Sequence, residues 1–290
     1  MAQSSRDIKR RISSITSTQQ ITRAMEMVAA AKLRRAQETV ISTRPYFDRL
    51  TTSLGTALRA AQEQGEDLPE VLQEREGNSH CLVVLTSDRG LAGSYNAAII
   101  RKAEAFLQEH PETEMVIVGR KARDHFRRRN ITALAEFVGL GDRPELRQAI
   151  DIGQVILDFF QHEMFDRVTV LYTKFVNTVT QPVTLRTILP VTDQLAEVER
   201  SGPEPLYMYE PSINEVLETL IPLYVNAAIY QSLNEAKTSE LAARMNAMRN
   251  ATENADELIS KLNLTYNRAR QAQITKEIAE IVGGADALQS

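Results

Sequence analysis

Apolar and small side chains recur at alternating intervals of four and three residues over the first part of the chain. From about residue 4 to residue 60 they are Ile8, Ile12, Ile15, Ala29, Leu33, Ala36, Val40, Phe47, Leu50 and Leu54. This spacing predicts one long amphipathic helix, because residues three and four apart lie on the same helix face. Pro45 interrupts the pattern, so we expect a kink or a break of the helix near Arg44.

The apolar face of this predicted helix changes midway. Gln19, Thr22 and Glu26 occupy positions at which the spacing requires apolar residues. The apolar residues beside them lie on a neighbouring face, at Ile21, Met25 and Val28. A helix that changes its apolar face is expected to meet different neighbours along its length.

The last part of the chain, from residue 212 to about residue 288, carries a second and stricter pattern. Its four-three stripe runs through Leu241, Met245, Met248, Thr252, Ala255, Ile259, Leu262, Tyr266 and Ala269. Such a stripe is typical of a coiled coil. At about 1.5 Å per residue the segment would be roughly 110 Å long, and a helix of that length needs a partner along its stripe. We expect the partner to be the N-terminal helix, running antiparallel.

The second helix is predicted to be longer than the first, so its end should extend beyond the pair. Near Gln271 the stripe shifts to another face. That face carries Ile274, Ile278, Ile281, Val282 and Leu288. These side chains would be exposed in the isolated chain, and an exposed apolar helix end predicts a binding site in a partner protein.

The periodicity changes between the two helical segments. Residues 62–79 are polar and rich in charges, which predicts a linker with at most a short helix. Residues 80–190 alternate short apolar runs with helix patterns, which predicts a Rossmann-like α/β domain with a mostly parallel sheet. The predicted fold is therefore an α/β domain, residues 80–205, joined to a long antiparallel coiled coil formed by residues 1–61 and 206–290.

Charge is distributed unevenly along the chain. The net charge is −4, but residues 1–60 hold eleven Lys or Arg and four Asp or Glu, so they carry +7 and the remainder −11. This asymmetry fits either a basic helix facing an acidic partner or a solvated helix face. The small net charge of the whole chain does not suggest a nucleic-acid binder.

No stretch reaches the ~18 apolar residues that would span a bilayer, so we expect no direct membrane insertion. A single cysteine, Cys81, excludes an internal disulfide.

Candidate chemistry is sparse. The segment from Ser87 to Asn96 follows a predicted strand and opens a helix, which is where phosphate loops lie. Its glycines, Gly90 and Gly93, fit neither the P-loop nor the dinucleotide-binding spacing, so a tight turn is the simpler interpretation. The four histidines, at positions 80, 110, 125 and 162, show no metal-ligand spacing. We therefore expect no catalytic residue, no cofactor and no metal.

Several motifs resemble those of one known family. SITSTQQITRAMEMVAAAKLRRA (14–36) and ARQAQITKEIAEIVGGADAL (269–288) are similar to the N- and C-terminal signatures of the gamma subunits of F-type ATP synthases, of the bacterial type. STRPYFDRL, TSDRGLAGSYN and LYMYEPSINEVLETLIPLYV (206–225) resemble the same family. The resemblance covers the chain except for the linker.

The resemblance implies a rotor shaft that has no active site of its own. In this family the coiled coil lies inside a ring of three alpha and three beta subunits, and the α/β domain contacts the epsilon subunit and the membrane c-ring. Proton flow turns the shaft, and ATP is made or hydrolysed on beta. The basic first helix would suit an acidic loop of beta.

The matching motifs also imply residues that contact the ring: Met25, Arg270, Gln271, Thr275, Glu277 and Ile278. Met25 lies in the AMEM segment, where family members couple rotation to catalysis. Arg270 and Gln271 match a pair that hydrogen-bonds the beta subunits. Packing within the coiled coil is an alternative role for Met25, and a solvated charge is an alternative for Arg270.

A second group of matching residues, Tyr207, Tyr209 and Glu210, implies a foot that contacts the c-ring. Packing of Tyr207 on its own domain is the alternative. One departure from the family is Arg23, where many relatives have Lys. Chloroplast-type relatives carry an insertion with a redox-active Cys pair, and this chain has neither, which excludes thiol regulation.

The N-terminus, from Met1 to Asp7, has neither an apolar signal region nor a long transit segment, so we expect the mature protein to begin here. The expected location is peripheral, on the cytoplasmic face of a bacterial cell membrane, to which the ATP synthase complex attaches the chain.

The sequence leaves two other functions open. One is a passive coiled-coil scaffold, and the other is a nucleotide-binding Rossmann-like protein.

Overall fold

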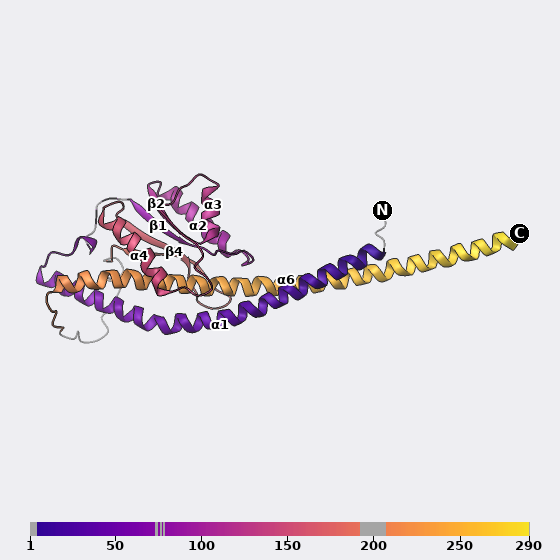
Figure 1. Cartoon of the computed structure of the whole chain (residues 1–290), viewed down its shortest axis with the longest axis horizontal. Helices are drawn as coiled ribbons and strands as arrows, with labels where there is room; N and C mark the ends of the chain where they lie inside the picture. Colours follow the sequence, from indigo (N-terminus) through magenta and orange to yellow (C-terminus); the bar gives the residue numbers. More distant parts are fainter. Residues whose placement is uncertain (1–4, 73–74, 76, 78, 192–206, 290) are drawn as a thin grey trace. The chain divides into compact units, whose positions relative to one another are not determined.

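The computed structural model describes residues 5–72, 75, 77, 79–191 and 207–289. It divides into two compact units. Met1–Ala29 and Met245–Ser290 form one, here called the coiled-coil unit, and Ala30–Arg244 forms the domain unit. Two long helices, α1 (Ser5–Gln64) and α6 (Ile213–Gln289), contribute to both (Figure 1). The boundary predicted between residues 205 and 206 lies outside the described residues.

A kink or a break was predicted near Arg44; helix α1 continues through Pro45, so the break does not occur. A proline inside a helix removes one backbone hydrogen bond and costs about 3 kcal/mol. Apolar residues on both sides of Pro45 offset that cost, because Val40, Leu50 and Leu54 are buried. Packing therefore overrides the local preference of the sequence.

The domain unit is built on a five-stranded sheet with the order β3-β2-β1-β4-β5. The strands are β1 (His80–Leu85), β2 (Thr113–Val118), β3 (Ala135–Phe137), β4 (Arg167–Thr173) and β5 (Val183–Leu189). Strands β1 to β4 are parallel and β5 is antiparallel to β4, which confirms the mostly parallel sheet. Strand β3 was not predicted, because three half-buried residues are too few to show a period.

Helices cover both faces of this sheet (Figure 1). They are α2 (Tyr95–Glu109), α3 (Arg120–Arg127) and α4 (Leu146–Gln161), together with parts of α1 and α6. Helices α2 and α3 pack around a core that includes Phe126, and α4 packs with α1 and α6 around a larger core that includes Phe160 and Tyr224. The parts of α1 and α6 that belong to the domain unit therefore form one of its layers. A short 3-10 turn, Glu70–Leu72, lies in the predicted linker.

The coiled-coil unit shows the predicted antiparallel pairing. The side chain of Gln19 hydrogen-bonds Asp256, and the hydroxyl oxygens of Thr22 and Thr252 lie 2.8 Å apart. One step further along, Arg249 Nε donates to Glu26 Oε1 at 3.0 Å. The stripe of α6 from Met245 to Ala269 is buried or half-buried. The three polar positions of α1 therefore stay on the paired face, where each meets a polar partner.

The free energy of unfolding should fall in mild acid because of His80. Its imidazole is buried at the start of β1, with a ring centroid 4.3 Å from that of His110. Burial lowers the pKa of His80, and the positive potentials of His110 and Arg167 lower it further, while Asp166 opposes them. Protonation therefore favours the unfolded chain. The stabilisation is complete above the unfolded-state pKa of 6.5 and is lost progressively as the pH falls from there through the lower folded-state pKa.

We expect the urea midpoint of the wild-type chain to fall between about pH 7.5 and about pH 5.5, across the range in which histidine titrates. A His80→Phe variant keeps an aromatic ring beside Phe106 and removes the titrating group. Its midpoint should therefore depend less on pH. Equal slopes for the two chains would assign the acid sensitivity to other groups.

Candidate interaction sites

The end of α6 extends beyond α1 in the coiled-coil unit. Thr22 of α1 faces Thr252 of α6. Because the two helices are antiparallel, Ser5, which is 17 residues before Thr22, lies opposite residue 269, which is 17 residues after Thr252. Residues 270–289 of α6, here called the overhang, thus have no described residue of α1 opposite them. The side chains from Arg270 to Ala279 are all exposed. A helix segment of this length without packing partners indicates a surface that is completed by another protein.

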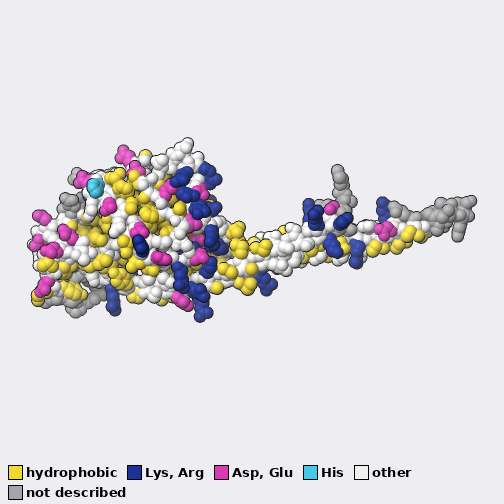
Figure 2. Space-filling view, viewed as in Figure 1, with side chains coloured by type: hydrophobic (Ala, Val, Ile, Leu, Met, Phe, Trp, Pro, Cys, Tyr) yellow, Lys and Arg dark blue, Asp and Glu magenta, His cyan; other side chains and the backbone are white. Residues whose placement is uncertain are grey.

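One face of the overhang is apolar. Ile274, Ile278 and Ile281 are four and three residues apart, and they are 47%, 56% and 72% exposed. Figure 2 shows hydrophobic side chains along the coiled-coil unit, to which the overhang belongs. The predicted apolar face is thus confirmed from Ile274 to Val282. Leu288, also predicted there, lies outside the residues whose side chains are described.

The predicted polar contact residues lie beside this apolar face. Thr275 Oγ1 donates to the Gln271 carbonyl at 3.0 Å, which orients the hydroxyl along the helix. Glu277 Oε1 accepts from Gln273 Nε2 at 3.0 Å. The overhang therefore presents an exposed guanidinium, amides, a carboxylate and isoleucines within about three helical turns. Such a mixture suits an interface with an apolar centre and a polar rim.

Met25 is not part of that group. It is half-buried on α1, in the region where the polar pairs join the two helices. Ile21 and Val28, on the same side of α1, are 61% and 54% exposed. The shift of the apolar face predicted for this part of α1 thus leaves two large apolar side chains on the surface. This is a second candidate contact surface, separate from the overhang in sequence.

Tyr207, Tyr209 and Glu210, here called the foot, lie just before α6. Tyr207 is exposed, whereas Tyr209 packs partly against the larger core. Ser212 follows as the N-cap of α6, with the Glu215 N–H donating to Ser212 Oγ at 3.2 Å. The start of α6 is therefore fixed, and the foot is presented from a defined position in the domain unit.

The turn that contains Gly90 does not form a nucleotide pocket. It follows β1 at the carboxyl edge of the sheet, next to β4, where the strand order changes direction and ligands bind in open α/β sheets. Helix α6 occupies that crevice: Tyr95 Oη donates to the Ala236 carbonyl, and Arg244 donates to the Gly90 carbonyl. The remaining cavity has a volume of about 40 Å³. Small-molecule sites enclose about 300 Å³ or more, so this arrangement argues against the nucleotide-binding alternative.

The described residues contain no group of three or more His, Cys, Asp or Glu side chains placed to hold a metal ion. Over the same residues, no helix combines the length and the apolar character needed to cross a bilayer. Cys81 is buried in β1, and burial raises its pKa to about 12, so the thiol is not a nucleophile at neutral pH. The surfaces that stand out are suited to binding proteins.

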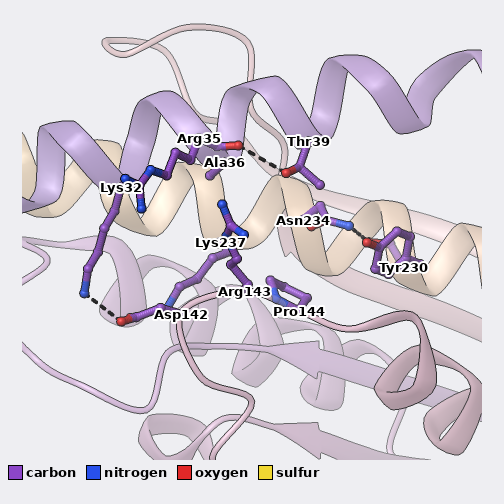
Figure 3. A pocket seen from close by; sticks show the side chains of 10 residues that line it. All are labelled: Lys32, Arg35, Ala36, Thr39, Asp142, Arg143, Pro144, Tyr230, Asn234 and Lys237. Atoms are coloured by element: carbon purple, nitrogen blue, oxygen red, sulfur yellow. Dashed lines mark hydrogen bonds and ion pairs between the residues drawn. The ribbon is translucent and has the colours of Figure 1, made fainter.

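One site was missed by reasoning from the sequence. Lys32, Arg143 and Lys237 line a common hollow in the domain unit (Figure 3). They come from α1, from the loop before α4, and from α6. No spacing rule connects positions so far apart in the chain, and the only signal was the excess of basic residues in the first helix.

An extended helical pair joined to an α/β domain, with an exposed apolar helix end, defines an interaction protein of the shaft type. The family model described as ATP synthase matches residues 4–288. The ATP synthase gamma chain of Symbiobacterium thermophilum is 48% identical over 291 residues and covers 100% of both chains. The gamma chain of Heliobacterium modesticaldum is 47% identical, with 98% of both chains covered.

Solved structures show the same fold. A chain from the central stalk and c-ring of Tetrahymena thermophila mitochondrial ATP synthase matches with a TM-score of 0.60 and 26% identity, covering 80% of this chain and 99% of that one. A chain of the Euglena gracilis mitochondrial enzyme has a TM-score of 0.67 and 22% identity, covering 98% and 94%. The chain therefore belongs to the family of ATP synthase gamma chains, the central-stalk subunits of F-type ATP synthases.

Proposed function

We propose that this chain is a rotor shaft that transmits rotation between a membrane c-ring and a ring of alpha and beta subunits. Proton flow turns the c-ring, the shaft turns with it, and ATP is made or hydrolysed on the beta subunits. The shaft itself contributes no catalytic residue. The observation that carries the proposal is the overhang, because its exposed isoleucines require a partner that the chain does not supply.

The proposed contacts divide between two surfaces. In the overhang, Ile278 enters an apolar collar of the ring, and Arg270 and Gln271 hydrogen-bond the beta subunits. Thr275 and Glu277 complete the polar rim. Exposure of all these side chains in the isolated chain supports the assignment. An arginine that is desolvated against carbonyls or carboxylates makes strong charge-assisted bonds and is a frequent hot spot in interfaces.

Met25, on α1, is proposed to contact the ring and to couple rotation to catalysis. It lies between the exposed Ile21 and Val28, so a ring subunit that packs on those residues also contacts Met25. Ile21 and Val28 are exposed on the same side of α1, which makes the surface of the shaft asymmetric. An asymmetric shaft presents a different surface to each of three beta subunits as it turns.

The foot is proposed to join the domain unit to the c-ring, with the epsilon subunit beside it. Tyr207 supplies an exposed aromatic ring, and Glu210 supplies a charge beside it. The chain would then be peripheral to the cytoplasmic face of a bacterial membrane. We also propose the functional division made above, with 1–61 and 206–290 as shaft, 62–79 as linker and 80–205 as the α/β domain.

The test is the ATPase activity of matched alpha and beta subunits measured with and without this chain. We expect strong stimulation that saturates at one copy of the chain per ring. The chain should also co-purify with the ring. If the chain neither stimulates the ATPase activity nor co-purifies with the ring, the result favours a passive coiled-coil scaffold. Such a scaffold requires only that the two helices pair.

A further inference from the structure

The domain unit contains a hollow of about 430 Å³ that none of the predicted contact residues lines. It shares Pro144 and Lys237 with the smaller cavity beside the Gly90 turn. Figure 3 shows its lining, drawn from α1, the loop before α4, and α6. The residues are Lys32, Arg35, Ala36, Thr39, Asp142, Arg143, Pro144, Tyr230, Asn234 and Lys237. This lining is here called the basic hollow. Its volume lies within the range of about 300 to 1,000 Å³ that is usual for small-molecule sites.

The charge of the basic hollow is strongly positive. Four of its side chains are cationic and one is a carboxylate, so the lining carries 4 − 1 = +3. Asp142 is already engaged: Lys32 Nζ lies 2.6 Å from its Oδ2, and Lys237 Nζ lies 3.7 Å from its Oδ1. The Lys32 hydrogen bond holds the pKa of Asp142 below its usual value, so the carboxylate stays ionised.

Arg35 and Arg143 differ from the two lysines. Both are exposed at the hollow, and among the ion pairs of the described residues neither guanidinium has a carboxylate partner. Because they line the same cavity from separate elements, both guanidinium groups are placed to contact an anion bound there.

The neutral donors of the lining are used within the helices. Thr39 Oγ1 donates to the Arg35 carbonyl at 3.1 Å, and Asn234 Nδ2 donates to the Tyr230 carbonyl at 2.8 Å (Figure 3). Recognition in the basic hollow therefore depends mainly on ammonium and guanidinium groups. Guanidinium groups bind phosphate oxygens in pairs, with a geometry that suits them better than an uncharged ligand.

We propose that the basic hollow binds a small anion with two or more linked phosphate groups, such as pyrophosphate or the phosphate tail of a nucleotide. Three net positive charges match such an anion, whereas a single phosphate would leave part of the charge uncompensated. The bound anion would connect α1, the loop before α4, and α6. Because it binds the folded domain unit only, it should also raise the stability of that unit.

The experiment is calorimetric titration of the full chain with pyrophosphate, ATP and adenosine at about 0.15 M salt, where exposed charges are screened beyond roughly 8 Å. We expect saturable binding of pyrophosphate and ATP at one site, and none of adenosine. A double variant, Arg35→Ala with Arg143→Ala, should weaken binding by about tenfold or more, because each charged hydrogen bond contributes about 1.5 kcal/mol or more.

The matched control is Arg34→Ala with Arg147→Ala, which removes the same charge from exposed positions outside the lining. This control should bind pyrophosphate like the wild type. Equal weakening in both double variants would show non-specific attraction and overturn the proposal, as would the lack of saturable binding. Displacement of pyrophosphate by an equimolar acidic peptide would assign the hollow to protein carboxylates and also overturn it. Circular dichroism of each variant verifies folding.

Discussion

Replacing Ile274, Ile278 and Ile281 together by serine should weaken binding of the chain to an alpha–beta ring by about 100-fold or more. Burying an isoleucine side chain contributes about 1.5–3 kcal/mol, and every 1.4 kcal/mol is tenfold in affinity. The three side chains are exposed in the isolated chain, so their loss should leave its folding unchanged. The measurement is a titration of ring ATPase activity against the concentration of each chain, which gives the dissociation constant directly.

A matched control is available on the opposite face of the same helix. Ala272, Lys276 and Ala279 lie about 140–200° around the helix axis from Ile274. Serine at these three positions should change the dissociation constant much less than serine at the isoleucines. Equal effects from both triple variants would mean that helix propensity, rather than the apolar face, determines binding. The proposed role of Ile278 would then be wrong.

Replacing Gly119 by alanine should destabilise the domain unit by about 3 kcal/mol or more. Gly119 joins β2 to α3 with a φ of 101°, a conformation that other residues rarely adopt. A Cβ at this position would lie 2.2 Å from the Thr86 carbonyl oxygen at the end of β1. Backbone atoms cannot move aside as a flexible side chain can, so the backbone at the adjacent carboxyl ends of β1 and β2 must distort. Urea unfolding followed by circular dichroism measures the loss.

Gly139→Ala separates backbone conformation from steric clash. Gly139 has a φ of 78°, and an added Cβ would meet no atom within 4 Å. Only the conformational cost remains, about 1–2 kcal/mol. A clearly larger loss at Gly119 is therefore expected. Similar losses at the two positions would show that the domain unit relieves the contact with Thr86 at little cost.

The sequence predicted those parts of the fold that repeat along the chain. The stripe from Leu241 to Ala269 and the apolar end of α6 follow from spacing alone, since a helix face is a local property. The overhang follows in turn from the unequal lengths of two paired helices. These features contain most of the proposed interaction surfaces. The residue roles within them rest on family motifs and on exposure in the isolated chain.

Other features depend on contacts between distant residues, and spacing cannot reveal them. Strand β3 exists because Val116 and its neighbours offer open hydrogen-bonding positions to Ala135–Phe137. Helix α1 survives Pro45 because of packing partners that lie elsewhere in the chain. The basic hollow requires Lys32, Arg143 and Lys237 to meet through the tertiary fold. In each case the deciding energy is tertiary rather than local.

The polar pairs in the coiled-coil unit have a consequence for slippage between the two helices. Sliding α6 by one heptad would place Glu26 opposite Asp256 instead of Arg249, and two carboxylates would face each other. Sliding it the other way would place Thr22 opposite Met245 and leave its hydroxyl without the Thr252 partner. An apolar stripe alone would tolerate either shift. The shaft therefore has one register, and twisting applied at one helix is transmitted to the other instead of being dissipated by sliding.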